Sequence, residues 1–112
     1  MKTTKTPWGR YEILYEEKGL WVKRIVINPK EKLSKQYHNQ REEVWIYENG
    51  NGNWIVGNET IKAYGKQLIK IPRTKIHRAE GNTEGLSFIE IATGNPDEKD
   101  IVRIEDVYNR TI

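Results

Sequence analysis

The residues most able to do chemistry in this chain are its two histidines and the polar side chains near them. Gln36, His38 and Glu43 lie within the short stretch LSKQYHNQREEVW, and His77 lies in IPRTKIHRAEG. An amide oxygen, two imidazoles and a carboxylate form a mixed nitrogen and oxygen set that suits a divalent transition metal. The chain has no cysteine, so no thiolate can contribute. We hypothesise one divalent ion, Zn, Mn, Co, Ni or Fe, at these four residues.

The spacing of the four candidate ligands requires β-structure to bring them together. Gln36 and His38 are two positions apart, so on a strand they project from the same face. A turn after His38 followed by a new strand would return Glu43 over this pair, because a β-hairpin places nearby residues opposite one another. His77 follows Pro72, which marks a bend after the apolar run QLIKI. The metal hypothesis therefore depends on these strands and this bend meeting in space.

Short alternating runs separated by turn residues dominate the chain. The runs are LWVKRIVIN, EVWIYEN, NWIVGN, KQLIKIP and LSFIEIAT, and turn signals fall at NPKE, ENGNGN, VGNET, AYGK and AEGNTEG. Short strands at regular spacing are typical of an all-β sandwich or barrel. Only PDEKDIVRIEDVY, near the C-terminus, offers a partly helical segment, with Asp97 and Glu98 as an acidic first turn. We predict strands for most of residues 20–92.

The spacing of the candidate ligands resembles the two sequence motifs of the cupin family. The first motif has a small residue, a ligand pair at i and i+2, a glutamate and a glycine. The second has a glycine, a proline and then a histidine. Lys30 and Thr74 differ from the motifs, since the family usually has glycine at both places. The motif positions in this sequence are Lys30, Gln36, His38, Glu43 and Gly50, followed by Gly65, Pro72, Thr74 and His77.

Longer segments resemble the cupin domain of type II mannose-6-phosphate isomerases, which is often fused behind a mannose-1-phosphate guanylyltransferase. TPWGRYEIL, VKRIVINP, LSKQYH, REEVW, IPRTKIHR, FIEIATG and DIVRIEDVYNR match that family's segments in the same order, over residues 6–110. The resemblance implies a single cupin domain over residues 1–112, an all-β jelly roll, or double-stranded β-helix, that forms a barrel of antiparallel strands. It includes no guanylyltransferase domain, so we expect this chain not to make a sugar nucleotide by itself.

The resemblance also implies a function. We expect a metal-dependent enzyme that binds a sugar phosphate and interconverts mannose 6-phosphate and fructose 6-phosphate through a cis-enediolate. The family commonly has further histidines where this chain has Asn39, Gln40 and Val44, which alters the residues expected to orient the ligands. Two alternatives remain open. One is a non-catalytic, metal-dependent sugar-phosphate-binding or regulatory module, and the other is a different cupin enzyme, such as an epimerase or a dioxygenase.

Two further side chains are candidates for catalysis. Lys23 and Arg24 are adjacent on a strand, so they point to opposite faces and only one can enter a barrel lumen. Val22 and Val26 share the face of Arg24, which favours Arg24 as the group that grips a phosphate or polarises a carbonyl. Glu90 lies on an otherwise apolar strand face, where it is the candidate proton relay if that face lines a polar cavity. The alternatives are a solvated rim position for the arginine and a core-edge ion pair for the glutamate.

The remaining aromatic and charged residues are expected to be structural. Arg78 must point away from the lumen if its neighbour His77 points in, which favours a surface or phosphate-rim position. The segment DIVRIEDVYNR is expected to close over the barrel or a dimer partner, with Arg103, Glu105 and Asp106 as pairing groups. Core or sheet-face positions, rather than sugar-stacking platforms, are expected for the four tryptophans, Trp8, Trp21, Trp45 and Trp54.

Charge and hydropathy restrict the partners and the compartment. The net charge is +3, with 19 Lys and Arg interleaved among 16 Asp and Glu, and the sequence shows no basic stripe that would track a phosphate backbone. We therefore expect no nucleic-acid partner. The apolar runs are far shorter than a membrane span, and the N-terminus lacks an apolar signal core. We expect a cytoplasmic protein with no membrane partner, paired as a homodimer through a sheet edge.

Overall fold

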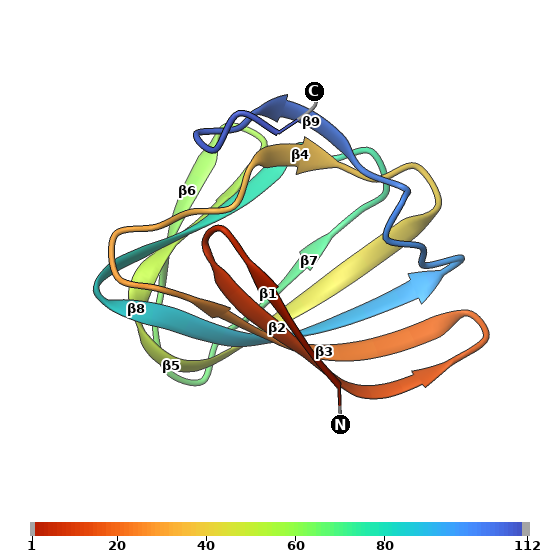
Figure 1. Ribbon diagram of the computed structural model, residues 1–112, viewed down its shortest axis with the longest axis horizontal. Coiled ribbons are helices and arrows are strands. Elements are labelled where there is room, and N and C mark those ends of the chain that lie inside the picture. Colours follow the sequence, from red (N-terminus) through yellow and green to blue (C-terminus); the bar gives the residue numbers. More distant parts are fainter. Residues whose placement is uncertain (1, 111–112) are drawn as a thin grey trace.

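The computed structural model describes residues 2–110, and within them regular structure consists of β-strands (Figure 1). No helix in this part of the chain is long and apolar enough to cross a bilayer. The single-domain prediction also includes residue 1 and residues 111–112, which lie outside the described residues. The strands are β1 (Lys2–Thr6), β2 (Gly9–Glu17), β3 (Leu20–Ile27), β4 (Lys35–Tyr37), β5 (Arg41–Val56), β6 (Glu59–Ala63), β7 (Leu68–Ile71), β8 (His77–Gly94) and β9 (Val102–Glu105).

The two long strands β5 and β8 form the centre of the fold. They pair antiparallel along most of their lengths, and β8 also pairs with β3, which continues the sheet through β2 to β1. Beyond the start of β8 the sheet continues through β4 to β9, while β6 and β7 pair with β5. The sheet curls around an interior space (Figure 1). The prediction of an all-β barrel of antiparallel strands is confirmed.

The glycine-rich stretches mark bends inside β5 and β8 instead of turns between strands. The pairing of these strands shifts register between Tyr47 and Asn49 and again between Gly50 and Gly52. A Cβ on Gly50 would lie 2.2 Å from the carbonyl oxygen of Gly85, and Gly50 has φ +87°. Only glycine tolerates both the close approach and this backbone conformation. The segment ENGNGN therefore curls one continuous strand.

The core is aromatic and lies between β5, β8 and their neighbours. The Trp45 and Phe88 ring centroids are 4.7 Å apart, and Trp54 meets Phe88 edge to face at 5.8 Å. Trp45 also contacts the His77 ring at 5.5 Å, so the core supports one candidate ligand directly. All four tryptophans are buried, as predicted. The buried hydrophobic cluster contains Trp8, Ile25, Ile27, Leu33, Trp45, Trp54, Ala63, Ile71, Ala79, Leu86 and Phe88.

The C-terminal segment closes over the barrel as a strand. The prediction of a partly helical segment is wrong, because residues 102–105 form β9, which pairs with β4. Arg78 is buried at 4% exposure, which contradicts the predicted surface or rim position. Its Nε donates to the Leu33 carbonyl at 2.8 Å and its Nη1 to Glu105 at 2.8 Å. Arg78 thus links β8 to the loop before β4 and to β9.

Candidate metal centre and adjoining cavity

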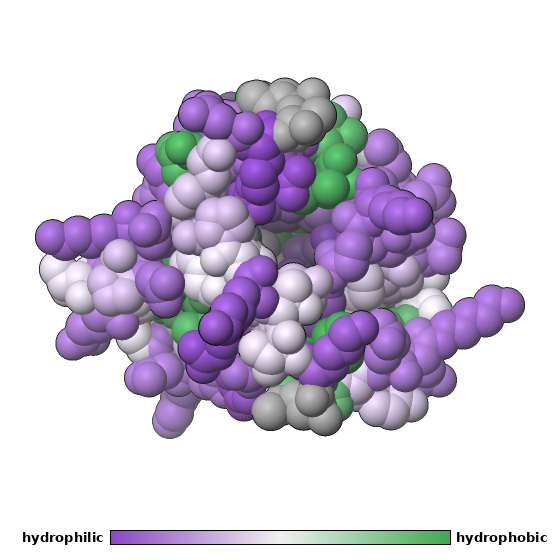
Figure 2. Space-filling view, in the orientation of Figure 1, coloured by the Kyte–Doolittle hydropathy of each residue, from purple (hydrophilic) through white to green (hydrophobic). Residues whose placement is uncertain are grey.

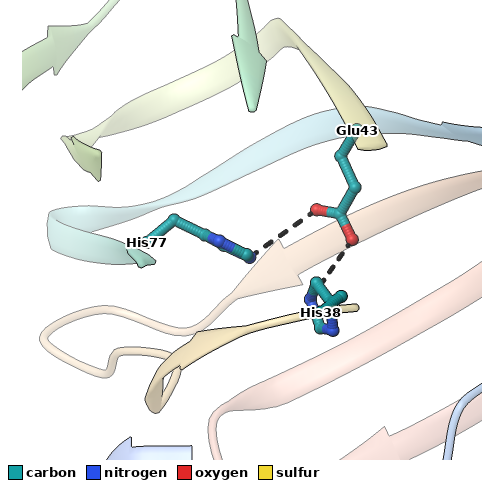
Figure 3. A group of neighbouring side chains, drawn as sticks. All are labelled: His38, Glu43 and His77. Atoms are coloured by element: carbon teal, nitrogen blue, oxygen red, sulfur yellow. Dashed lines mark ion pairs between the residues drawn. The ribbon is translucent and has the colours of Figure 1, made fainter. Parts of the chain in front are cut away.

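Three of the four predicted ligands meet inside the barrel (Figure 3). His38 follows β4, Glu43 lies in β5, and His77 begins β8. Their ligand atoms all lie within 4.8 Å of one another, and all three side chains are buried. His38 Nε2 is 3.4 Å from Glu43 Oε2, and His77 Nε2 is 3.8 Å from Glu43 Oε1. The three residues come from separate parts of the chain, so the curled sheet brings them together.

Main-chain carbonyls set the orientation of both imidazoles. His38 Nδ1 lies 2.7 Å from the Asp100 carbonyl oxygen, and His77 Nδ1 lies 2.8 Å from that of Lys75. A carbonyl only accepts, so each Nδ1 carries the proton and each Nε2 presents its lone pair. Burial lowers the pKa of His38 to about 4, and burial also lowers the pKa of His77. Both rings are therefore neutral at pH 7, the form in which histidine binds metals.

Gln36, the fourth predicted ligand, lies beside this group. It is buried, and its Cα is paired with that of His77 across β4 and β8. Its amide nitrogen donates to the Ser34 carbonyl and hydroxyl oxygens, each at 3.2 Å. These bonds leave the amide oxygen as the atom free to act as an acceptor or ligand. Gln36 also lines the cavity described below.

Sequence reasoning missed Arg41, which contacts the ligand group. Arg41 is buried, its Nε donates to Glu43 Oε2 at 2.8 Å, and its Nη2 donates to His38 Nε2 at 3.0 Å. Burial alone would raise the pKa of Glu43, but the adjacent guanidinium helps hold this pKa below its ordinary value. Arg41 and Glu43 are two apart on β5 and so share a face. Once Glu43 was chosen as a ligand, that spacing could have indicated Arg41.

The residues present fit a divalent metal. Two imidazole lone pairs and an ionised carboxylate converge in a buried space, and such an electron-rich group needs a cation. His38, Glu43 and His77 supply three ligands, and the Gln36 amide oxygen is available as a fourth. The guanidinium of Arg41 provides the balancing positive charge in this structure.

The substitutions expected to alter ligand orientation lie away from the ligands. Asn39 and Gln40 are exposed, and their backbone N–H groups donate to the Asp100 carboxylate at 3.0 and 2.7 Å. Val44 is next to Glu43 on β5 and therefore faces the opposite side of the sheet. The groups that hold both imidazoles are main-chain carbonyls, which these substitutions leave in place.

A cavity of about 360 Å³ adjoins the ligand group. It lies between the β1–β2 hairpin, β3, β4 and the C-terminal segment, and Figure 2 shows a recess near the middle of this face. Cationic side chains outnumber carboxylates in its wall, five to two. Residues from these elements, from the loop before β4, and from β5 and β8 line it: Thr4, Lys5, Thr6, Pro7, Trp8, Tyr11, Lys23, Ile25, Leu33, Ser34, Gln36, Arg41, Glu90, Glu98, Ile101, Arg103 and Arg110.

Glu90 is a buried carboxyl group in the cavity wall. Burial, assisted by the nearby Glu43 carboxylate, raises the pKa of Glu90 to about 8. The indole Nε1 of Trp21 donates to Glu90 Oε2 at 2.8 Å and fixes the carboxyl group. A carboxyl with a pKa near neutrality and a fixed orientation is suited to proton transfer.

The prediction that Arg24 enters the lumen is wrong, and Lys23 enters instead. Lys23 is 3% exposed, forms an ion pair with Glu98, and has its Nζ 3.6 Å from the ring centroid of Trp21. Arg24 lies on the outer face, where it binds Glu48 at 2.8 Å and Glu12 at 3.0 Å. Val22 and Val26 are half-buried on that outer face, so their apolar character misled the assignment.

Arg103 is another of the five cationic side chains in the cavity wall. Its Nε is buried and has no hydrogen-bond partner in the part of the chain that the structure describes. The two other predicted pairing groups of the C-terminal segment do have partners, since Glu105 binds Arg78 and Asp106 binds Arg110. A cationic side chain in the cavity wall whose own N–H lacks a protein partner is suited to an anionic ligand.

The sequence matches a known protein family and is similar to longer bacterial proteins. The family model described as mannose-6-phosphate isomerase C-terminal matches residues 1–106. The chain is 36% identical over 107 residues to the xanthan biosynthesis protein XanB of Xanthomonas campestris, covering 94% of this chain and 23% of that protein. It is also 36% identical over 107 residues to the mannose-1-phosphate guanylyltransferase ManC of Salmonella typhimurium, covering 93% and 22%. The chain thus spans less than a quarter of these relatives.

Solved structures share the fold at low sequence identity. KdgF from Halomonas superposes with a TM-score of 0.77 at 10% identity, over 88% of this chain and 93% of that one. A cupin-2 domain protein of Rhodospirillum rubrum superposes with a TM-score of 0.70 at 19% identity, over 81% of this chain and 67% of that one. The fold is therefore the cupin double-stranded β-helix, as predicted.

Proposed function

Because the chain belongs to the mannose-6-phosphate isomerase C-terminal family, we propose that it is a metal-dependent sugar-phosphate isomerase. The proposed reaction interconverts mannose 6-phosphate and fructose 6-phosphate through a cis-enediolate. The observation that carries the proposal is the cationic cavity in which the buried carboxyl of Glu90 adjoins the His38, Glu43 and His77 group. A cavity of about 360 Å³ is within the range of small-molecule sites.

The cations of the cavity wall support an anionic substrate. Lys23 and Arg103 both line the cavity, and the Nε of Arg103 has no hydrogen-bond partner among the described residues. We assign the phosphate group to these two residues, since ammonium and guanidinium groups form charge-assisted hydrogen bonds with phosphate oxygens. Lys23 would exchange its present partner, the half-exposed Glu98, for the phosphate.

Glu90 is the proposed proton relay. Aldose–ketose exchange moves one proton between the carbons C1 and C2 and a second proton between the adjacent oxygens O1 and O2, and we assign the carbon-bound proton to Glu90. One carboxyl oxygen of Glu90 would accept that proton and give it back on the same face of the enediolate. Its raised pKa of about 8 makes both steps accessible near neutral pH, and Trp21 holds the carboxyl in one orientation.

Gln36, His38, Glu43 and His77 would hold the divalent ion. When bound, the ion supplies Lewis-acid stabilisation of negative charge that develops on the substrate oxygens. The chain's contribution is to keep both imidazoles neutral and fixed through the Asp100 and Lys75 carbonyls. The surrounding core, through Trp45, keeps water away from the His77 ring.

Two variants separate proton transfer from metal binding. In Glu90→Gln, turnover of mannose 6-phosphate should fall by at least about a hundredfold, because a carboxamide cannot relay the proton, while the metal content stays that of the parent. In His38→Ala, metal affinity should fall at least about tenfold, with activity falling in proportion to the lost metal. Asn39→Ala, which changes an exposed neighbour, serves as the control and should leave both quantities unchanged.

The measurements are metal analysis of the purified protein and a coupled assay of fructose 6-phosphate formation. If the metal-loaded parent binds mannose 6-phosphate without converting it, the non-catalytic binding or regulatory module becomes the better description. Epimerase and dioxygenase activities have their own readouts, the appearance of an epimer and the consumption of oxygen. If the Glu90→Gln variant turns over like the parent, Glu90 is not the relay.

A further inference from the structure

Arg41 occupies a position between the ligand group and the cavity. Arg41 lines the cavity, whereas the described side chains of His38, Glu43 and His77 do not contribute to the cavity wall. Its guanidinium lies 4.6 Å from the ring centroid of Trp21, and its Nη1 donates to the Asp97 carbonyl at 3.0 Å. The guanidinium therefore covers the side of the ligand group that faces the cavity.

The atoms that Arg41 contacts are the atoms a metal would use. Arg41 Nη2 donates a hydrogen bond to the lone pair of His38 Nε2 at 3.0 Å, and Arg41 Nε donates one to Glu43 Oε2 at 2.8 Å. The single Nε2 lone pair cannot serve an N–H donor and a metal at once. A divalent ion at ligand distance would also repel a guanidinium held against the same two atoms. Metal and guanidinium therefore compete for His38 and Glu43.

We propose that Arg41 is a displaceable counter-ion, released into the cavity by metal binding and there available to an anion. In this structure the guanidinium neutralises Glu43, and a bound divalent ion would take over that role. The freed cation would stay near Trp21 and the Asp97 carbonyl, which it contacts in this structure. Metal and anion binding are then coupled, and by linkage each increases the affinity for the other by the same factor.

The inference rests on the proposed metal site but does not depend on isomerisation. Its test uses Co²⁺ as the metal and sulfate as the anion, with Co²⁺ affinity measured by competition with a chelator. Arg41→Gln should bind Co²⁺ about tenfold more tightly than the parent, because no guanidinium must be displaced. Sulfate should tighten Co²⁺ binding in the parent and have a much smaller effect in Arg41→Gln.

Arg73→Gln is the matched control. Arg73 also donates its Nε to a carboxylate at 2.8 Å, that of Glu42, but this pair lies on the surface. The Arg73→Gln variant should bind Co²⁺ as tightly as the parent does, and sulfate should tighten its Co²⁺ binding as it does in the parent. If Arg41→Gln binds Co²⁺ no more tightly than the parent, or if neither protein binds Co²⁺, the proposal is wrong. Tight Co²⁺ binding without isomerase activity would overturn the proposed function and leave this inference standing.

A measurement on the parent keeps the inference testable if Arg41→Gln does not fold. In protein labelled with ¹⁵N-arginine, the Nε–H of Arg41 should be protected from exchange by the buried Glu43 carboxylate. Its signal is assigned by its loss in Arg41→Lys. Addition of Zn²⁺, which is diamagnetic, should shift this signal and speed its exchange with water. A signal that keeps its position and protection in the Zn²⁺-loaded protein would contradict displacement.

Discussion

At the scale of single residues, the candidate centre depends on which atoms the main chain controls. The Asp100 and Lys75 carbonyls fix both imidazoles, so each Nε2 is held close to the Glu43 carboxylate. Where a side chain accepts the hydrogen bond that orients a metal-binding histidine, a substitution of that side chain removes the bond. A main-chain acceptor survives substitution, which explains how the chain keeps its ligand geometry with asparagine and glutamine at positions 39 and 40.

The neighbours Lys23 and Arg24 provide a test of the cavity assignment. Lys23→Met should weaken mannose 6-phosphate binding to the metal-loaded protein by about tenfold or more, because a charge-assisted pair with phosphate is lost. The metal content should be unchanged. Arg24→Met removes an equal charge from the opposite face of β3, where Arg24 binds Glu48 and Glu12, and should have little effect. The measurement is calorimetric titration, and an equal loss in both variants would count against the cavity as the phosphate site.

The sequence was sufficient to predict candidate ligands, but it did not show which face of each strand points into the barrel. Residue type and spacing predicted Gln36, His38, Glu43 and His77 as ligands, and the structure brings the His38, Glu43 and His77 side chains together. Period-two alternation separates the two faces of β3 but does not say which is the lumen when both carry apolar residues. Lys23 was therefore rejected and Arg24 chosen. Arg41 was missed because arginine is mostly a surface residue, although its two-residue spacing from Glu43 places both on one strand face.

At the scale of strands, apolar alternation predicted the central elements and failed at both ends of the chain. The runs chosen for residues 20–92 correspond to β3, β5, β7 and β8. Strand β1 consists of Lys and Thr and has no apolar face, so it forms only because β2 offers it an edge. Strand β9 has only four residues, VRIE, in which apolar and charged residues alternate. This alternation is too short to outweigh the acidic residues before it, which favour a helix start.

The two motif positions that lack glycine keep the backbone that glycine favours. Lys30 has φ +64° and Thr74 has φ +66°. The left-handed region is costly for a β-branched residue, and Thr74 is held there partly because its N–H donates to the His38 carbonyl at 2.8 Å. Both positions thus adopt a left-handed backbone against the local preference of their side chains.

Thr74→Gly should stabilise the fold. Relief of the left-handed strain exceeds the added chain entropy of glycine, so the free energy of unfolding should rise by about 0.5–1 kcal/mol. Thr60→Gly, in the exposed strand β6, is the control and should lower the free energy of unfolding by a similar amount, because no strain is relieved there. Urea denaturation of both variants provides the measurement, and destabilisation by Thr74→Gly would show that its side-chain bond to the Arg73 carbonyl outweighs the strain.

The turn after β9 should make stability depend on pH in the acid range. The Asp106 side chain is fully buried and accepts hydrogen bonds from the Arg110 guanidinium at 2.7 and 3.1 Å. Arg110, with help from the backbone N–H groups of Tyr108 and Arg110, lowers the pKa of Asp106 to about 2. A depressed pKa contributes stability that is present above the unfolded pKa of about 4 and is lost as pH falls through the folded value.

Asp106→Asn should therefore destabilise the protein most near neutral pH. The difference in free energy of unfolding between parent and variant should be about 2 kcal/mol at pH 6 and should shrink between pH 4 and pH 2. Glu42→Gln is the control, because its ion pair with Arg73 is on the surface and contributes little. Chemical denaturation across this pH range measures both. A difference for Asp106→Asn that stays constant with pH would mean that the charge of Asp106 does not matter.

At the scale of the whole molecule, the curled sheet has an open edge at its N-terminal end. Strand β1 is at one end of the strand order. Its pairing with β2 ends at the Lys2–Ile13 pair, whereas β2 continues to Glu17, so β1 does not cover the last part of β2. In the N-terminal segment TPWGRYEIL, Trp8 is buried and Tyr11 is half-buried against the cavity. The exposed apolar residues near this edge are instead Leu14 and Tyr15, at 37% and 53% exposure. An edge with exposed apolar side chains is a common place for a second chain to pair.

We predict a homodimer that pairs along this edge. Light scattering at micromolar concentration should give a mass of about twice the 13.2 kDa of one chain. Tyr15→Glu should shift the protein toward the monomer, because it places a charge on the edge next to Glu17 and to the same residues of the partner. Tyr64→Glu is the matched control, since Tyr64 is also exposed, at 61%, but follows β6 on another part of the sheet. A monomeric parent, or equal dissociation in both variants, would rule out the β1–β2 edge as the dimer interface.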